Sequence, residues 1–169
     1  MQLLIVWHSR TRASQQAAFF AAQGARDTLI QMDSQQRITV CCMPALQVQA
    51  QDLLQAQAYL FCAPENLGSL SGEMKTFFDL NYYAVLEQLN GRPYSAIISA
   101  GSAGQGAAQQ IERICTGWRL NLIHPITILN SRAQTPSAIA ALKQLTPEQQ
   151  QQSKQIGGLL AAHIALSLD

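Results

Sequence analysis

Leu3-Leu-Ile-Val-Trp-His-Ser-Arg-Thr-Arg-Ala-Ser14, near the start of the chain, passes from an apolar run into small hydroxylated and basic residues. The apolar run is typical of a buried strand. The segment from Ala13 to Ala22, rich in alanine and phenylalanine, is typical of a helix. The stretch therefore predicts a strand, a tight loop and a helix in direct succession.

The predicted loop has the features of an anion site. The first N–H groups of a helix lack intrahelical partners, and the helix dipole adds partial positive charge there. Ser9, Thr11 and Ser14 can donate hydroxyl hydrogen bonds to the same anion. Arg10 and Arg12 are cations at the unfavourable end of a helix unless an anion lies nearby. The alternative is a solvated first turn in which Ser or Thr is an ordinary N-cap.

Composition limits the class of protein. The chain has 169 residues, 48% of them hydrophobic, which fits one domain spanning 1–169. A net charge of +1 with 12% charged residues argues against nucleic acid, an anionic membrane or an acidic electron-transfer surface as the main contact. No apolar run approaches transmembrane length, and no basic segment precedes the first apolar run. We expect a cytoplasmic protein.

Metal binding is not supported by the cysteines and histidines. The cysteines form no C-x-x-C pattern and lie in or beside apolar segments, so we interpret them as small buried hydrophobes. The histidines are scattered, without a carboxylate or cysteine at ligand spacing. These residues are Cys41, Cys42, Cys62 and Cys115, and His8, His124 and His163.

Strands and helices are predicted to alternate along the chain. The first helix should end at Gln23, with Gly24 as its C-cap. Pro64 should end the third strand, and Pro125 should place the fifth at an edge or interrupt it. Later strands are expected at Ile38–Cys42, Tyr59–Cys62, Ser95–Ala100 and Asn121–Leu129, and helices at Ala13–Gln23, Gln47–Gln57, Gly72–Leu89 and Ala107–Trp118.

The last part of the chain predicts one further long helix. Residues 131–137 are polar and turn-like and lead to a short helix through Lys143. Thr146-Pro-Glu-Gln149 combines an N-cap, a proline at the first helical position and a capping-box glutamine. The apolar face of this helix is expected to contain Ile156, Leu159, Leu160, His163 and Ile164.

Five apolar strands alternating with helices predict an α/β fold with a doubly wound parallel sheet. Five strands fit the order 2-1-3-4-5, whose switch point lies between strands one and three. The ligand should then contact three loops, Ser9–Ser14, Pro64–Ser71 and Gly101–Gly106.

The second of these loops has a family resemblance. Ala63-Pro-Glu-Asn-Leu-Gly-Ser-Leu-Ser-Gly-Glu-Met-Lys-Thr-Phe-Phe-Asp79 resembles the loop and helix after strand three in the NADPH-dependent FMN reductases and the related flavodoxin-like quinone reductases. His8-Ser-Arg-Thr11, with Ser14, is similar to the phosphate loop of that family. The resemblance implies a flavodoxin-like three-layer sandwich that binds FMN and uses NADPH or NADH as reductant.

The sequence departs from the family pattern in two places. Arg12 stands where many relatives have glycine, which is compatible only with a right-handed backbone at that residue. Asn66 and Leu67 stand where relatives usually have an aromatic residue, so ring stacking from this loop is not expected. Leu67 could pack on one flavin face, or a partner subunit could supply Tyr82 or Tyr83. The alternative for the tyrosines is packing at a helix end.

The resemblance also assigns cofactor residues. Donors to the phosphate would be Ser9, Arg10, Thr11, Arg12, Ala13 and Ser14, and the ring would contact Pro64, Glu65, Asn66, Leu67 and Gly68. Close backbone approach to the ring would use Gly101, Gly104 and Gly106, which could instead form a flexible turn. Because the chemistry belongs to the cofactor, no catalytic side chain is predicted. Glu65 and Asp79 are the candidates for such a side chain, but Glu65 could instead order the loop or an interface, and Asp79 could cap or pair on the third helix.

Three functional hypotheses remain open. The first is an FMN-binding NAD(P)H-dependent oxidoreductase that reduces a quinone or flavin, as a homodimer or tetramer. The second is a flavodoxin-type electron carrier. The third is a flavodoxin-like interaction module that has lost flavin, for which Arg12 and the missing loop aromatic are the support.

Overall fold

A seven-stranded sheet forms the centre of the computed structural model, which describes residues 1–167. The core strands follow the order β2-β1-β3-β5-β6, with β7 continuing beside β5 and β4 pairing with β3. Their bounds are β1 Gln2–Trp7, β2 Thr39–Pro44, β3 Ala58–Asn66, β4 Ser69–Leu70, β5 Pro93–Ala100, β6 Asn121–Leu122 and β7 Thr127–Asn130. The core strands pair in parallel, which confirms the predicted 2-1-3-4-5 arrangement.

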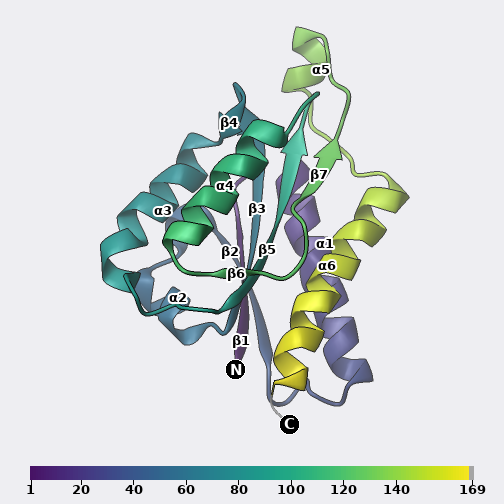
Figure 1. Cartoon of the computed structure of the whole chain (residues 1–169). Coiled ribbons are helices and arrows are strands. Elements are labelled where there is room, and N and C mark those ends of the chain that lie inside the picture. Colours follow the sequence, from purple (N-terminus) through teal and green to yellow (C-terminus); the bar gives the residue numbers. More distant parts are fainter. Residues whose placement is uncertain (168–169) are drawn as a thin grey trace.

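Helices cover both faces of the sheet (Figure 1). Helices α1 and α6 lie on one face, and α2, α3 and α4 lie on the other. Their bounds are α1 Ala13–Gln31, η1 Ala45–Gln47 (a 3-10 turn), α2 Ala50–Gln55, α3 Gly72–Val85, α4 Gln105–Gly117, α5 Pro136–Ala140 and α6 Pro147–Leu166. The fold is therefore the expected three-layer α/β sandwich. The predicted domain extends to residue 169, and its last two residues lie outside the described part.

The first helix continues well beyond the predicted end at Gln23. Gly24 is not a C-cap but a buried residue inside α1, at the crossing with α6. A Cβ on Gly24 would lie 2.1 Å from the carbonyl oxygen of Lys154, and one on Gly157 would lie 1.9 Å from that of Ala21. Glycine is needed here because two helix backbones approach closely, not because the helix ends.

Of the two predictions that rest on a proline in a strand, the one for Pro64 is wrong and the one for Pro125 is confirmed. Pro64 lies within β3 and is in register with Ser99 of β5, whereas the pairing of β3 with β1 ends at Cys62. Proline is tolerated there because one side of the strand no longer has a neighbour that needs its N–H. The fifth strand is split into β6 and β7 around Pro125, which confirms the predicted interruption.

Several helix predictions need smaller corrections. The predicted helix Gln47–Gln57 is a 3-10 turn followed by the short α2, α3 ends at Val85 instead of Leu89, and α4 begins at Gln105. The capping box at Thr146 and Gln149 starts α6 as predicted. The predicted apolar face of α6 is wrong at Leu159 and His163, which are exposed, because Gly157 and Ala161 face α1 instead.

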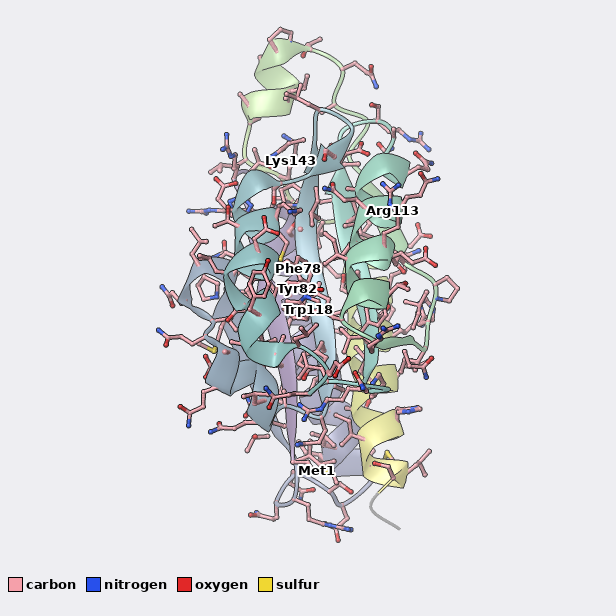
Figure 2. The ribbon with its side chains drawn as sticks, turned by 60° about the vertical axis from the view of Figure 1, so that its left-hand side comes forward. Met1, Phe78, Tyr82, Arg113, Trp118 and Lys143 are labelled. Carbon is pink, nitrogen blue, oxygen red and sulfur yellow. The ribbon has the colours of Figure 1, made fainter. Side chains whose placement is uncertain are left out.

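Two apolar clusters hold the layers together. The cluster under α2, α3 and α4 is aromatic, and Phe78 and Trp118 pack with ring centroids 5.0 Å apart. Figure 2 shows these two side chains between α3 and α4, with Tyr82 beside them. The cluster under α1 and α6 consists mainly of alanine, isoleucine and leucine, and its small residues let these helices lie close to the sheet.

Candidate cofactor site

Three loops meet at the carboxyl-terminal ends of β1, β3 and β5, at the edge of the sheet from which β4 and α5 project (Figure 1). They are residues 8–12 between β1 and α1, residues 64–71 from the end of β3 through β4, and residues 101–104 between β5 and α4. This is the crevice where open parallel sheets bind ligands. The structure thus brings the three predicted loops to one edge.

The β1–α1 loop offers backbone donors. Arg12 is the N-cap of α1 and adopts a left-handed conformation, with φ 67°, and no side chain caps the helix. Within residues 1–167, no backbone N–H from residue 11 to residue 15 donates to another residue. Successive N–H groups around a left-handed residue form an anion-binding concavity, which the dipole of α1 reinforces. The right-handed backbone that Arg12 was expected to need is not what the structure has.

The hydroxyls of this loop differ in their availability. Ser9 and Thr11 are partly exposed, and neither hydroxyl bonds to a residue in the described part of the chain. Ser14 is buried, and its Oγ lies 2.7 Å from Oγ of Ser99 at the end of β5. Ser9 and Thr11 are therefore the free donors, and Ser14 joins the loop to β5.

Two basic residues of the loop, His8 and Arg10, contact a carboxylate. Arg10 donates to Oε1 of Glu73 in the first turn of α3, at 3.1 Å. His8 Nε2 lies 3.5 Å from the same oxygen, and His8 Nδ1 lies 2.9 Å from Oγ of buried Ser71. Burial lowers the pKa of His8 more than Glu73 raises it, so this contact joins a neutral imidazole to a carboxylate. Glu73 has a lowered pKa, mainly because its backbone N–H donates to its own carboxylate.

The second loop is a β-hairpin, a feature that the sequence did not predict. Strands β3 and β4 pair at Asn66 and Ser69, and the two turn residues, Leu67 and Gly68, have φ values of 52° and 72°. Two left-handed residues match the twist of a two-residue hairpin. Leu67 is fully exposed at the tip.

Glu65 connects the hairpin to the third loop. Its Oε2 accepts a 2.7 Å hydrogen bond from the N–H of Gly104, and Oε1 accepts a longer one, 3.4 Å, from Ala107. The carboxylate thereby occupies the N-terminus of α4, where negative charge is favourable. This corresponds to the structural alternative for Glu65, ordering of the loop.

The glycines of the third loop approach protein atoms closely. A Cβ on Gly106 would lie 2.0 Å from the carbonyl oxygen of Gly68, and one on Gly104, whose φ is 98°, would lie 2.5 Å from Cγ2 of Ile128. At Gly101 the nearest atom is the carbonyl oxygen of Ala133, at 3.3 Å. The hairpin and α4 are thus in contact, and no planar ring fits between Gly68 and Gly106.

A cavity of about 980 Å³ lies next to these loops. Of the predicted residues, it is lined by Arg10, Thr11, Ala13, Pro64, Glu65, Asn66 and Gly101. The other predicted residues, which do not line it, are Ser9, Arg12, Ser14, Leu67, Gly68, Gly104 and Gly106. Its far wall comes from the end of β7 and from residues 131–149, which sequence analysis did not connect with the site. The only sequence signal there was the short apolar run Ala138-Ile-Ala-Ala-Leu142, which follows a polar, turn-like stretch.

The residues at this edge fit FMN. Unpaired N–H groups and two free hydroxyls suit a phosphate, and the cavity has the size and mixed polarity of small-molecule sites. Within residues 1–167, no three His, Cys, Asp or Glu residues form a group that could hold a metal ion.

The cysteines have no role at this edge. Cys62 and Cys115 are buried as predicted, and burial raises the pKa of both thiols. The prediction of burial is wrong for Cys41 and Cys42, which are half-buried on the edge strand β2; burial raises the pKa of Cys42 to about 11. None of the helices in the described residues has the length and apolar character needed to cross a membrane.

The fold and the loop geometry define a flavodoxin-like α/β protein with a phosphate-type loop after its first strand. The family model of the NADPH-dependent FMN reductases matches residues 8–134, more than half of the chain. The protein belongs to this family, and this supports an FMN-dependent oxidoreductase. A comparison with curated proteins finds no match.

Solved structures with the same fold include flavodoxins. A flavodoxin from the domain Archaea is 17% identical with a TM-score of 0.77, over 97% of this chain and 99% of that one. The WrbA-like flavodoxin from Agrobacterium tumefaciens is 13% identical with a TM-score of 0.73, over 98% of both chains. Rubredoxin oxygen:oxidoreductase from Desulfovibrio gigas is 15% identical with a TM-score of 0.73, over 99% of this chain and 37% of that one. At these identities the likeness concerns the fold.

Proposed function

We propose that the protein is an FMN-binding, NAD(P)H-dependent oxidoreductase that reduces a quinone or a flavin. The observation that carries the proposal is the run of unpaired N–H groups at the start of α1, beside a cavity of about 980 Å³. The membership of the NADPH-dependent FMN reductase family supports both the cofactor and the choice of reductant. When bound, FMN would supply the hydride chemistry, taking a hydride from the nicotinamide and passing it to the acceptor.

The chain's own residues bind and orient in this proposal. Ser9, Thr11 and the N–H groups after them would hold the phosphate, and Pro64 and Asn66 would border the ring system. Glu65 would keep the hairpin in place through Gly104, without contributing a proton. No side chain is assigned to acid or base catalysis.

The first experiment is the visible absorption spectrum of the purified protein, before and after adding FMN. We expect a bound yellow chromophore that is released as FMN, and turnover of NADH or NADPH with a quinone acceptor. A colourless protein that does not bind added FMN would contradict the proposal and favour the interaction module.

Substitution tests the phosphate site directly. The double variant Ser9→Ala, Thr11→Ala loses two hydroxyl donors to a charged group, so its Kd for FMN should rise by about a hundredfold. Thr76→Ala is the matched control, because Thr76 is exposed on α3 away from the cavity. Equal affinity in the double variant and the control would remove the phosphate site from this loop.

An electron carrier is the second candidate, since flavodoxins are among the structural neighbours. Reductive titration separates the two functions. A carrier would take up electrons in two separate one-electron stages and would react slowly with NAD(P)H, whereas a reductase would be reduced by NAD(P)H in one two-electron stage.

We also propose a homodimer or tetramer in the cytoplasm. Apolar side chains on the outer face of α3 support the oligomer, because Leu80 is 73% exposed and Tyr83 is 83% exposed. Tyr82 and Tyr83 pack on each other with ring centroids 5.1 Å apart, so a partner could contact both. The four free cysteines agree with a reducing compartment. Sedimentation equilibrium would test the oligomer, and a monomer at micromolar concentration would contradict it.

A further inference from the structure

The cavity has one wall most of which lies beyond the stretch matched by the family model, which ends at residue 134. This wall is the strap, which we define as residues 131–146 between the end of β7 and the start of α6. It contains α5, which projects past the carboxyl edge of the sheet in Figure 1. The strap contributes Ile139, Leu142 and Lys143 to the same cavity that Thr11 and Pro64 line from the other side.

One end of the strap is fixed to the β1–α1 loop. The N–H of Lys143 donates to the carbonyl oxygen of Thr11 at 2.8 Å. Gln16, in the first turn of α1, donates from Nε2 to the carbonyl oxygen of Lys143 at 2.7 Å and accepts from the N–H of Leu145 at 3.3 Å. Three hydrogen bonds therefore hold the strap over the loop that we assign to the phosphate.

The part of the strap around α5 is internally ordered but packs on little else. Lys143 Nζ donates to the carbonyl oxygens of Ala138, Ile139 and Ala141, which would otherwise be the free acceptors at the end of α5. No residue of α5 is buried. The helix thus has a defined shape without an apolar core of its own.

Two apolar side chains of the strap are left exposed within the cavity. Ile139 is 56% exposed and Leu142 is 63% exposed, and both line it. Leu67, at the hairpin tip, is exposed as well, but it does not line the cavity and so gives it no apolar cover. The contact between Gly68 and Gly106 also leaves no slot between the second and third loops.

We propose that the strap is the apolar wall against which the ring system of bound FMN packs, with Ile139 and Leu142 as the side chains that contact the ring. The inference rests on the proposed function, because it concerns the same cofactor. The second loop has no aromatic residue that could cover the ring. In this proposal the strap provides that cover instead. Gln16 then fixes the position of that cover relative to the phosphate loop.

The test measures FMN affinity and dissociation, followed by flavin fluorescence. In the variant Ile139→Ser, Leu142→Ser we expect the Kd to rise by about thirtyfold, mainly through faster dissociation, because two apolar side chains no longer contact the ring. Ile30→Ser is the matched control, because Ile30 is 62% exposed on α1 and does not line the cavity. Its Kd should equal that of the wild type.

A second measurement uses the wild type alone. Trypsin can cleave the strap after Arg132 and Lys143, and mass spectrometry identifies the cut sites. FMN should slow cleavage at these two sites if the ring packs against the strap. Unchanged cleavage rates with saturating FMN would overturn the inference, as would a double variant that binds FMN like the control. A wild type that binds no FMN would overturn the proposed function as well, so the two failures are distinguishable.

Discussion

Removal of the Glu65 carboxylate should loosen the carboxyl edge of the sheet. Gly104, the N-cap of α4, has no side chain and φ 98°, so Glu65 provides the cap from the hairpin, through a 2.7 Å bond to the Gly104 N–H. Glu65→Gln keeps an acceptor oxygen but loses the charge–dipole attraction, which costs about 1 kcal/mol. Glu65→Ala also loses the charged hydrogen bond, which brings the cost to about 2–3 kcal/mol.

Urea unfolding of both variants measures these costs. For a chain of this size, about 1 kcal/mol corresponds to roughly 2–4 °C in Tm, so thermal unfolding should give the same ranking. Glu112→Gln is the control, because it removes the same charge from an exposed position in the second half of α4. If both Glu65 variants stay within about 0.5 kcal/mol of that control, the carboxylate does not cap the helix in solution.

Gly106→Ala should lower the free energy of unfolding by about 2 kcal/mol or more, because its Cβ would lie 2.0 Å from the Gly68 carbonyl oxygen. A urea midpoint equal to that of the wild type would contradict this and would mean that the hairpin moves away freely. Arg12→Gly should raise Tm by roughly 2–4 °C, because φ 67° costs a non-glycine residue about 1 kcal/mol, and a lower Tm in calorimetry would contradict this. The folded-state pKa of His8 lies below 6.5, so the unfolded chain binds more protons and stability falls as the pH drops through that value. Because the pKa of Glu73 is also lowered in the folded state, stability continues to fall below pH 4.5. Between about pH 7.5 and about pH 5.5, the free energy of urea unfolding should fall less for His8→Gln than for the wild type. Parallel plots of this free energy against pH for the two proteins would refute the role of His8.

The sheet could be predicted because its signals are local. Apolar runs such as Leu3–Val6, bounded by turn residues, identify buried strands, and alternation with helices leaves few topologies. The length of α1 could not be predicted in this way. Gly24 has the same local appearance as a C-cap, and only its contact with Lys154, far away in the sequence, shows that the helix continues.

The site was predictable in position but not in its pairings. A loop after each parallel strand must lie at the same edge, so loops 9–14, 64–71 and 101–106 were expected to meet. The bonds that join them, from Ser14 to Ser99 and from Glu65 to Gly104, depend on three-dimensional spacing that no period in the sequence encodes. The strap was missed for a related reason. Ile139 and Leu142 belong to a short predicted helix that no motif connects with the site, and only the fold brings them to the cavity.

The structure also separates two reasons for expecting an anion at the β1–α1 loop. The first was the misplaced charge of Arg10 and Arg12. Glu73 compensates Arg10 at 3.1 Å, so the Arg10 charge needs no ligand, whereas Arg12 has no ion pair within residues 1–167. The second was the unpaired backbone at the start of α1, and the five N–H groups from residue 11 to residue 15 still have no acceptor in the described chain. Backbone donors survive every substitution except one by proline, which has no N–H. Loss of the Arg10 charge should therefore affect phosphate affinity less than a change that moves the start of the helix.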